Sequence, residues 1–136
     1  SLTPKAVVLG VGCRKGTPQD TIESVLERFL QESGLHKEAI CAVASIDLKK
    51  EEPGLLAFCR AHSWIFKTYT AEELRRVPGE FTASAFVSGV TGVDNVCERS
   101  AVALSGGQIW HKKFAADGVT LAAAVKPFGL DWKYGR

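Results

Sequence analysis

The sequence has no marked excess of charge of either sign. Its 17 Lys and Arg residues nearly balance 15 Asp and Glu residues, which gives a formal net charge of +2 at pH 7. A protein that binds nucleic acid through bulk charge needs a larger positive excess. We therefore expect no nucleic-acid partner, and any preference for an anion must come from the local placement of cations.

The sequence also lacks a long apolar run. No stretch approaches the roughly 20 apolar residues that a membrane-spanning helix needs. The N-terminal residues carry no signal-peptide pattern, with its charged start and apolar centre. We therefore expect a protein that does not associate with a membrane.

Paired cysteines are missing as well. The four cysteines, at positions 13, 41, 59 and 97, form no CxxC pair, which argues against zinc ribbons and thioredoxin-type redox sites. Cys41 and Cys59 lie in apolar stretches, as buried thiols do. Because histidine and cysteine are scattered, we predict no metal site and no cofactor. This use of cysteine favours a reducing, cytoplasmic location.

Strand-like and helix-like patterns alternate along the chain, and we expect a single domain over residues 1–136. Hydrophobic residues make up 46% of the chain and charged residues 24%, as in ordinary globular domains. The expected strands cover residues 5–11, 39–46 and 64–69, and the expected helices cover residues 18–33, 51–62 and 71–77. The last of these helices opens with a capping box at Thr70.

The second half of the chain ends in a predicted hairpin. Residues 81–90 are expected to be helical or irregular, and Asp94 is the expected N-cap of a helix that ends near Leu104. Residues 108–114 and 119–125 are strand-like and flank an Asp-Gly turn. The predicted fold class is α/β, a mostly parallel sheet flanked by helices on both faces, with the C-terminal hairpin making the sheet mixed.

The stretch GVGCRKGT at residues 10–17 joins the first strand to the first helix. Ligands of open α/β sheets bind beyond the carboxyl ends of the strands, so this loop is a candidate site. Its glycines allow close backbone approach, Thr17 could cap the helix, and Pro18 suits the first helical position. Free backbone N–H groups and the helix dipole would then favour an anion.

Two cations strengthen this prediction. Arg14 can form paired hydrogen bonds with a carboxylate or phosphate, and Lys15 adds a point charge. The alternative is that the glycines only make a tight turn. Cys13 has two interpretations too, a nucleophile with a lowered pKa or a small residue that fills the turn.

The loop departs from the common nucleotide motifs. Its lysine precedes the last glycine, whereas a Walker A loop has the order GKT or GKS, and its GxGxxxG spacing is one residue longer than the dinucleotide fingerprint. Asp47 follows the second strand, but farther along than a ribose-binding acid should. A nucleotide-binding module therefore stays as a second alternative function.

Several motifs, in order, resemble a known family. GVGCRKGT (10–17), ASIDLK (44–49), GVTGVDNVCERSAVALSGG (89–107) and GVTLAAA (118–124) resemble the C-terminal domain of the cobalamin-biosynthesis protein CbiG. The short length is most similar to the CobE relatives of that domain. The resemblance covers nearly the whole chain, and the first loop and the V-x-E segment at Val96 and Glu98 are its most specific parts.

The resemblance implies a role in building the corrin ring of cobalamin. In the CobE branch it implies binding of a precorrin-type tetrapyrrole, as a carrier or a partner of other cobalamin-pathway enzymes. In larger CbiG proteins the implied activity is hydrolysis of cobalt-precorrin-5A, in which a ring lactone opens and acetaldehyde leaves. If the chain is an enzyme, the resemblance therefore implies a hydrolase that acts on a precorrin lactone, and any cobalt belongs to the ligand.

Precorrins are edged with acetate and propionate carboxylates, which suits cations at the edge of a sheet. Lys49 and Lys50 follow the second strand and should lie beside the first loop, unless they are only a solvated pair. Ser45 could donate its hydroxyl or simply end the strand. Glu98 is the best general acid or base; alternatively it pairs with Arg99 or a lysine in solvent, or stabilises the helix dipole. The predicted ligand-binding residues are Gly12, Cys13, Arg14, Lys15, Gly16, Thr17, Ser45, Lys49 and Glu98, and the predicted catalytic residues are Glu98 and Cys13.

Overall fold

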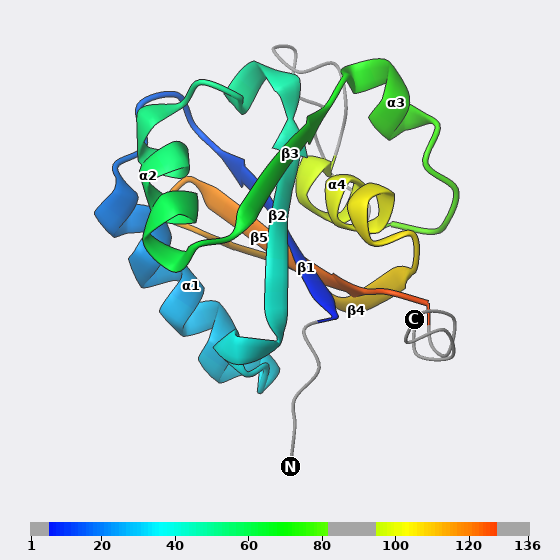
Figure 1. The fold of residues 1–136 in the computed structure, drawn as a ribbon, viewed down its shortest axis with the longest axis horizontal. Helices are drawn as coiled ribbons and strands as arrows, with labels where there is room; N and C mark the ends of the chain where they lie inside the picture. The colour runs from blue at the N-terminus through cyan, green and yellow to red at the C-terminus, as the bar shows by residue number, and fades with distance from the viewer. Residues whose placement is uncertain (1–5, 82–94, 128–136) are drawn as a thin grey trace.

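One mixed sheet of five strands runs through the molecule in the order β3-β2-β1-β5-β4 (Figure 1). The structure is a computed structural model, and it describes residues 6–81 and 95–127. The strands are β1 (Val7–Cys13), β2 (Ile40–Ile46), β3 (Ile65–Tyr69), β4 (Gln108–Ala116) and β5 (Val119–Val125). Strands β1, β2 and β3 are parallel, and the β4–β5 hairpin adds to β1 in antiparallel fashion.

Helices cover both faces of this sheet (Figure 1). The helices are α1 (Gln19–Ser33), α2 (Pro53–His62), α3 (Ala71–Arg75) and α4 (Val96–Ser105). Side chains alternate along β1, so that Leu9 joins the core under α1 and α2 while Val8 joins the core under α4. The predicted α/β fold with a C-terminal hairpin is confirmed. Among the described residues, no helix combines the length and the apolar character needed to span a bilayer.

Local patterns predicted most element boundaries to within two residues. The capping box at Thr70 is present, with its side chain accepting from Glu73 N and the Glu73 side chain accepting from Thr70 N. Asp117 and Gly118 adopt φ values of 50° and 79°, the positive values that a two-residue hairpin turn needs. The residues 82–90 of the segment expected to be helical or irregular lie outside the described residues.

The predicted N-caps of α1 and α4 need correction. Pro18 is the N-cap of α1, and the Thr17 hydroxyl instead donates a 2.6 Å hydrogen bond to the backbone oxygen of Arg14, inside the loop. The N-cap of α4 is Asn95, whose side chain accepts from Glu98 N, and Asp94 lies outside the described residues. In each case the neighbouring residue has the non-helical backbone that an N-cap requires.

Candidate functional site

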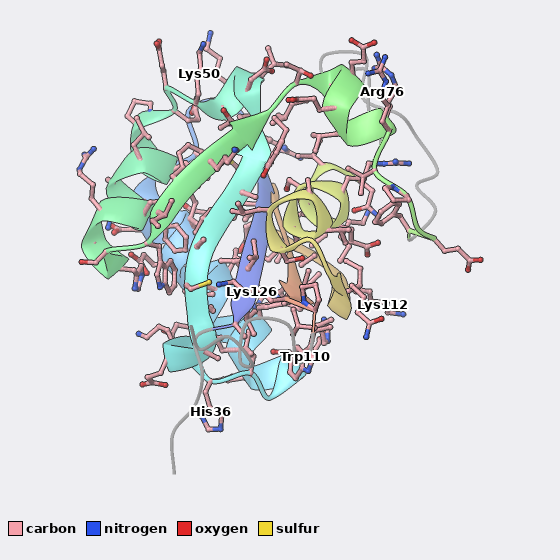
Figure 2. The ribbon with its side chains drawn as sticks, turned by 45° about the vertical axis from the view of Figure 1, so that its right-hand side comes forward. His36, Lys50, Arg76, Trp110, Lys112 and Lys126 are labelled. Carbon is pink, nitrogen blue, oxygen red and sulfur yellow. The ribbon has the colours of Figure 1, made fainter. Side chains whose placement is uncertain are left out.

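The carboxyl ends of the strands gather at one edge of the sheet. Strand β4 points the same way as β1 because both are antiparallel to β5. The β4–β5 turn therefore reaches the loop after β1, where Arg14 N donates a 3.2 Å hydrogen bond to Gly118 O. Figure 2 shows Lys50 at this edge, far from His36 and Trp110 at the opposite end of the molecule.

The backbone pairing between β1 and β2 stops before their carboxyl ends. The last paired residues are Gly10 and Ala44, although β1 continues to Cys13 and β2 to Ile46. Beyond that pair the hydroxyl of Ser45 donates a 2.6 Å hydrogen bond to Val11 O. Ser45 is fully buried, so its hydroxyl lies between the strands and joins them where the main chains no longer pair.

The loop after β1 is a tight turn. Thr17 N donates to Arg14 O at 3.2 Å, and Gly16 has a φ of +79°, which favours glycine at this position. The side chains of Arg14 and Lys15 are exposed. Within residues 6–81 and 95–127 neither of them forms an ion pair. The loop thus presents two cations to solvent.

A carboxylate already binds the backbone of this loop. The Oε2 atom of Glu52 lies 2.8 Å from Gly16 N and accepts its hydrogen bond. Glu52 belongs to the loop after β2, 36 residues further along the chain. Sequence reasoning identified the neighbouring lysines but missed Glu52, because no motif marks a contact that only the folded chain creates. The loop was predicted to bind the anionic group of a ligand, and in the structure the carboxylate of Glu52 occupies one of its backbone amides.

The other two glycines of the motif are required by packing. A Cβ atom on Gly10 would lie 1.8 Å from the backbone oxygen of Cys97, and one on Gly12 would lie 2.6 Å from the Thr120 hydroxyl oxygen. Gly10 therefore lets α4 approach the sheet, and Gly12 makes room for β5. For these two positions the packing of neighbouring elements accounts for the glycine without any ligand.

Cys13 lies at the end of β1 beside the second loop. Burial raises the pKa of its thiol, and Glu52 raises it further, whereas Lys49 and a hydrogen bond with Thr17 lower it without cancelling the effect of burial. The expectation of a lowered thiol pKa was wrong, because Cys13 packs against the core under α1 and α2. The hydrogen bond from Gly16 N to Glu52 places the loops after β1 and β2 side by side.

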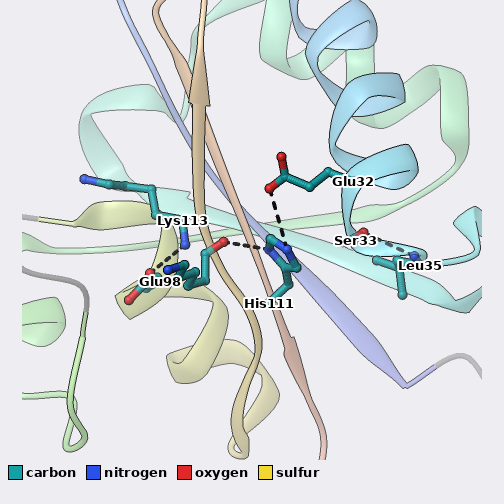
Figure 3. A network of polar contacts seen from close by, with 7 residues as sticks. Glu32, Ser33, Leu35, Glu98, His111 and Lys113 are labelled. Carbon is teal, nitrogen blue, oxygen red and sulfur yellow. Dashed lines mark hydrogen bonds and ion pairs between the residues drawn. The ribbon is translucent and has the colours of Figure 1, made fainter.

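Glu98 lies on the other face of the sheet, in the first turn of α4. It is 1% exposed, and its Oε2 accepts a 2.6 Å hydrogen bond from Lys113 N of β4 (Figure 3). The alternative that Glu98 pairs with Arg99 in solvent is excluded by this burial. Because Cys13 faces α1 and α2, the structure does not bring the two predicted catalytic residues together.

The contact of Glu98 depends on an irregularity in β4. The register between β4 and β5 shifts between His111 and Phe114, which takes Lys113 out of the regular ladder. Its freed amide points to Glu98 instead. His111 lies nearby, with Nδ1 2.9 Å from Lys112 O and Nε2 3.8 Å from a carboxylate oxygen of Glu32 (Figure 3).

No metal centre is assembled by the part of the chain that the structure describes. Groups of three or more His, Cys, Asp or Glu side chains that could hold an ion are absent from it. The candidate site is therefore defined by the loops after β1 and β2, with their cations, their bound carboxylate and the partly buried thiol of Cys13.

Comparison with known proteins identifies the family. A family model described as cobalamin synthesis G C-terminus matches residues 7–124. The chain belongs to this family. It is 39% identical over 124 residues to the cobalt-precorrin-5A hydrolase of Salmonella typhimurium, a match that covers 91% of this chain and 35% of that protein. The chain thus spans about a third of the length of that relative.

Two CobE proteins are also similar to this chain. Protein CobE of a Sinorhizobium species is 31% identical over 101 residues, covering 74% of this chain and 66% of that one. The crystal structure of CobE, a protein from the cobalamin biosynthetic pathway, superposes with a TM-score of 0.79 at 28% identity and covers 91% of this chain and 92% of that chain. The resemblance to the CbiG C-terminal domain and to CobE is confirmed, and it places the chain in a cobalamin-biosynthesis family.

Proposed function

We propose that the protein binds a precorrin-type tetrapyrrole at the carboxyl ends of its strands, as a carrier or partner of other enzymes in cobalamin biosynthesis. One observation carries the proposal. The Gly16 amide donates a hydrogen bond to the carboxylate of Glu52, and the flanking side chains of Arg14 and Lys15 are exposed and form no ion pair with any residue that the structure describes. A precorrin offers several such carboxylates around its rim.

The cations at this edge of the sheet favour ligands that carry carboxylates. Arg14 can form paired hydrogen bonds with one acid group of the ring, and Lys15 and Lys50 are exposed point charges on the two adjacent loops. Lys49 is half-buried beside Cys13 and makes the interior side of this edge more favourable to negative charge. The four cysteines are free thiols, which supports a reducing, cytoplasmic location.

A titration tests the proposal. Addition of the protein to precorrin intermediates should shift their visible absorption with saturable binding. Arg14→Ala should weaken binding by about 1.5–3 kcal/mol, the value of a charge-assisted hydrogen bond. The matched control is Arg60→Ala, which removes the same charge from an exposed position near the end of α2. Equal affinity of the two variants would exclude the loop as the binding site.

Hydrolysis is the second candidate function, because the Salmonella relative that matches over 124 residues is a cobalt-precorrin-5A hydrolase. Opening of a ring lactone would need a general base or a nucleophile. Glu98 is our candidate for the base, whereas burial raises the pKa of the Cys13 thiol and makes it a poor nucleophile at neutral pH. Release of acetaldehyde from cobalt-precorrin-5A, lost in Glu98→Gln while the variant stays folded, would establish this function. Binding without turnover would favour the carrier.

A further inference from the structure

Glu52 connects two loops that are distant in sequence. Its carboxylate leaves the loop after β2 and accepts a 2.8 Å hydrogen bond from Gly16 N in the loop after β1. Glu52 is also the N-cap residue of α2, yet its side chain makes no capping hydrogen bond there. The contact with Gly16 is therefore not a consequence of capping, and α2 does not depend on it for its first turn.

The two loops have a second and closer contact that does not involve Glu52. A Cβ atom on Gly54 would lie 2.1 Å from Thr17 O and 3.0 Å from Gln19 N, so the start of α2 packs directly against the backbone at the start of α1. The loops would remain together if Glu52 moved away. The hydrogen bond from Gly16 to Glu52 is thus dispensable for joining them.

The bond is also of a kind that another carboxylate can replace. It lies at the surface, where interactions of charged groups contribute little to stability because water competes for them. Arg14 and Lys15 flank it with exposed charges. An incoming acid group would find the same amide donor that Glu52 uses, together with cations that Glu52 does not engage.

We propose that Glu52 is a displaceable internal carboxylate that occupies the Gly16 amide until an acetate or propionate group of the macrocycle takes its place. This inference rests on the proposed function and names the backbone donor that receives a ligand acid. Exchange conserves the hydrogen bond of the Gly16 amide. The charge of Glu52 stays near the site after exchange, so Glu52 competes with the ligand and lowers its affinity.

The test compares Glu52→Ala with Glu51→Ala. Glu51 is the adjacent exposed glutamate, so its removal changes the net charge equally without freeing Gly16. Uroporphyrin, a stable tetrapyrrole with acetate and propionate arms, serves as the probe in a fluorescence titration. Glu52→Ala should bind it about three- to tenfold more tightly than Glu51→Ala, the range expected for loss of a partly exposed charged competitor. Affinities equal within about twofold would overturn the inference.

A second measurement separates this inference from the proposed function. In ¹⁵N-labelled protein, the Gly16 amide resonance should respond to tricarballylate, a tricarboxylate without a ring, more strongly in Glu52→Ala than in the wild type or in Glu51→Ala. Identical responses in the three proteins would overturn the inference even if uroporphyrin binds. A selective response without any tetrapyrrole binding would show that a carboxylate can replace Glu52 at the Gly16 amide, but it would reject the proposed function and the macrocycle as the source of that carboxylate.

The variant Glu52→Gln distinguishes two effects of Glu52, its occupation of the Gly16 amide and the repulsion between its negative charge and the ligand. The amide oxygen of glutamine can still accept from Gly16 but carries no charge. Uroporphyrin affinity between those of the wild type and Glu52→Ala supports displacement of a group that occupies the amide. Affinity equal to that of Glu52→Ala would mean that repulsion alone acts, and displacement would be rejected.

Discussion

The carboxylate of Glu98 in α4 holds the backbone amide of Lys113 in β4, with 2.6 Å between Oε2 and N (Figure 3). The amide is available because the register of β4 shifts beside it. A partly buried amide without an acceptor still costs free energy, so the glutamate stabilises the irregular strand as well as the contact between α4 and the sheet. This structural role exists whether or not Glu98 also takes part in chemistry.

Removal of the Glu98 carboxylate should therefore destabilise the fold. Glu98→Ala leaves Lys113 N without this acceptor, and we expect a loss of about 1–3 kcal/mol in the free energy of unfolding. Glu98→Gln keeps an oxygen acceptor and should lose less. Urea denaturation measures both, with exposed Glu27→Ala as the control. If Glu98→Ala matches Glu27→Ala, the hydrogen bond to Lys113 does not stabilise the protein.

Gly10 should tolerate no side chain. An alanine Cβ there would overlap the backbone oxygen of Cys97, so α4 would have to move away from the sheet. We expect Gly10→Ala to lower the free energy of unfolding by about 3 kcal/mol or more. Gly34→Ala is a suitable comparison, because Gly34 has open space around it and a positive φ, and it should lose only about 1 kcal/mol. Equal losses would contradict the close approach of α4 to β1.

Cys13 should behave as an unreactive thiol near neutral pH. Burial raises its pKa, so the thiolate fraction at pH 7 is smaller than in a free cysteine, whose pKa is about 8.5. Lys49→Ala removes a charge that lowers this pKa and should slow alkylation further, whereas Glu52→Ala should accelerate it. Peptide-level mass spectrometry after timed iodoacetamide treatment gives the rate at Cys13 alone. A wild-type Cys13 that reacts faster than free cysteine at pH 7 would contradict this prediction.

The sequence predicted what depends on neighbours along the chain. The capping box at Thr70 and the turn at Asp117 and Gly118 follow from local backbone preferences, and the alternating core of β1 follows from strand periodicity. The contacts of Glu52 and Glu98 were not predictable in this way. Each joins a carboxylate to a backbone amide on another element, and which amides remain free is decided only when the strands and loops have been placed.

For the candidate site, the sequence predicted the position of the loop but not the roles of its glycines or the pKa of Cys13. The position of the cationic loop followed from the order of strand and helix, because the loop after the first parallel strand lies at the carboxyl edge. The purposes of its glycines did not follow, since Gly10 and Gly12 are explained by α4 and β5, which come some hundred residues later in the sequence. The prediction of a lowered pKa for the Cys13 thiol was wrong. The sequence shows which charged residues are adjacent to Cys13, but it does not show how deeply the thiol is buried.

Ser45 offers a test of how β1 and β2 are held where their backbones stop pairing. Its hydroxyl is buried and donates at 2.6 Å to Val11 O, so Ser45→Ala should leave that oxygen without this donor and lower the free energy of unfolding by about 1–3 kcal/mol. Ser100→Ala is the matched control, because Ser100 is equally buried but its hydroxyl lies 3.3 Å from its acceptors, Ala44 O and Cys97 O, and should contribute less. Urea denaturation gives the two losses, and a tetrapyrrole titration of the same variants gives the affinity. We expect the tetrapyrrole affinity of Ser45→Ala to stay at the wild-type value, because the hydroxyl bonds to the neighbouring strand. A loss of affinity with unchanged stability would instead place Ser45 in contact with the ligand.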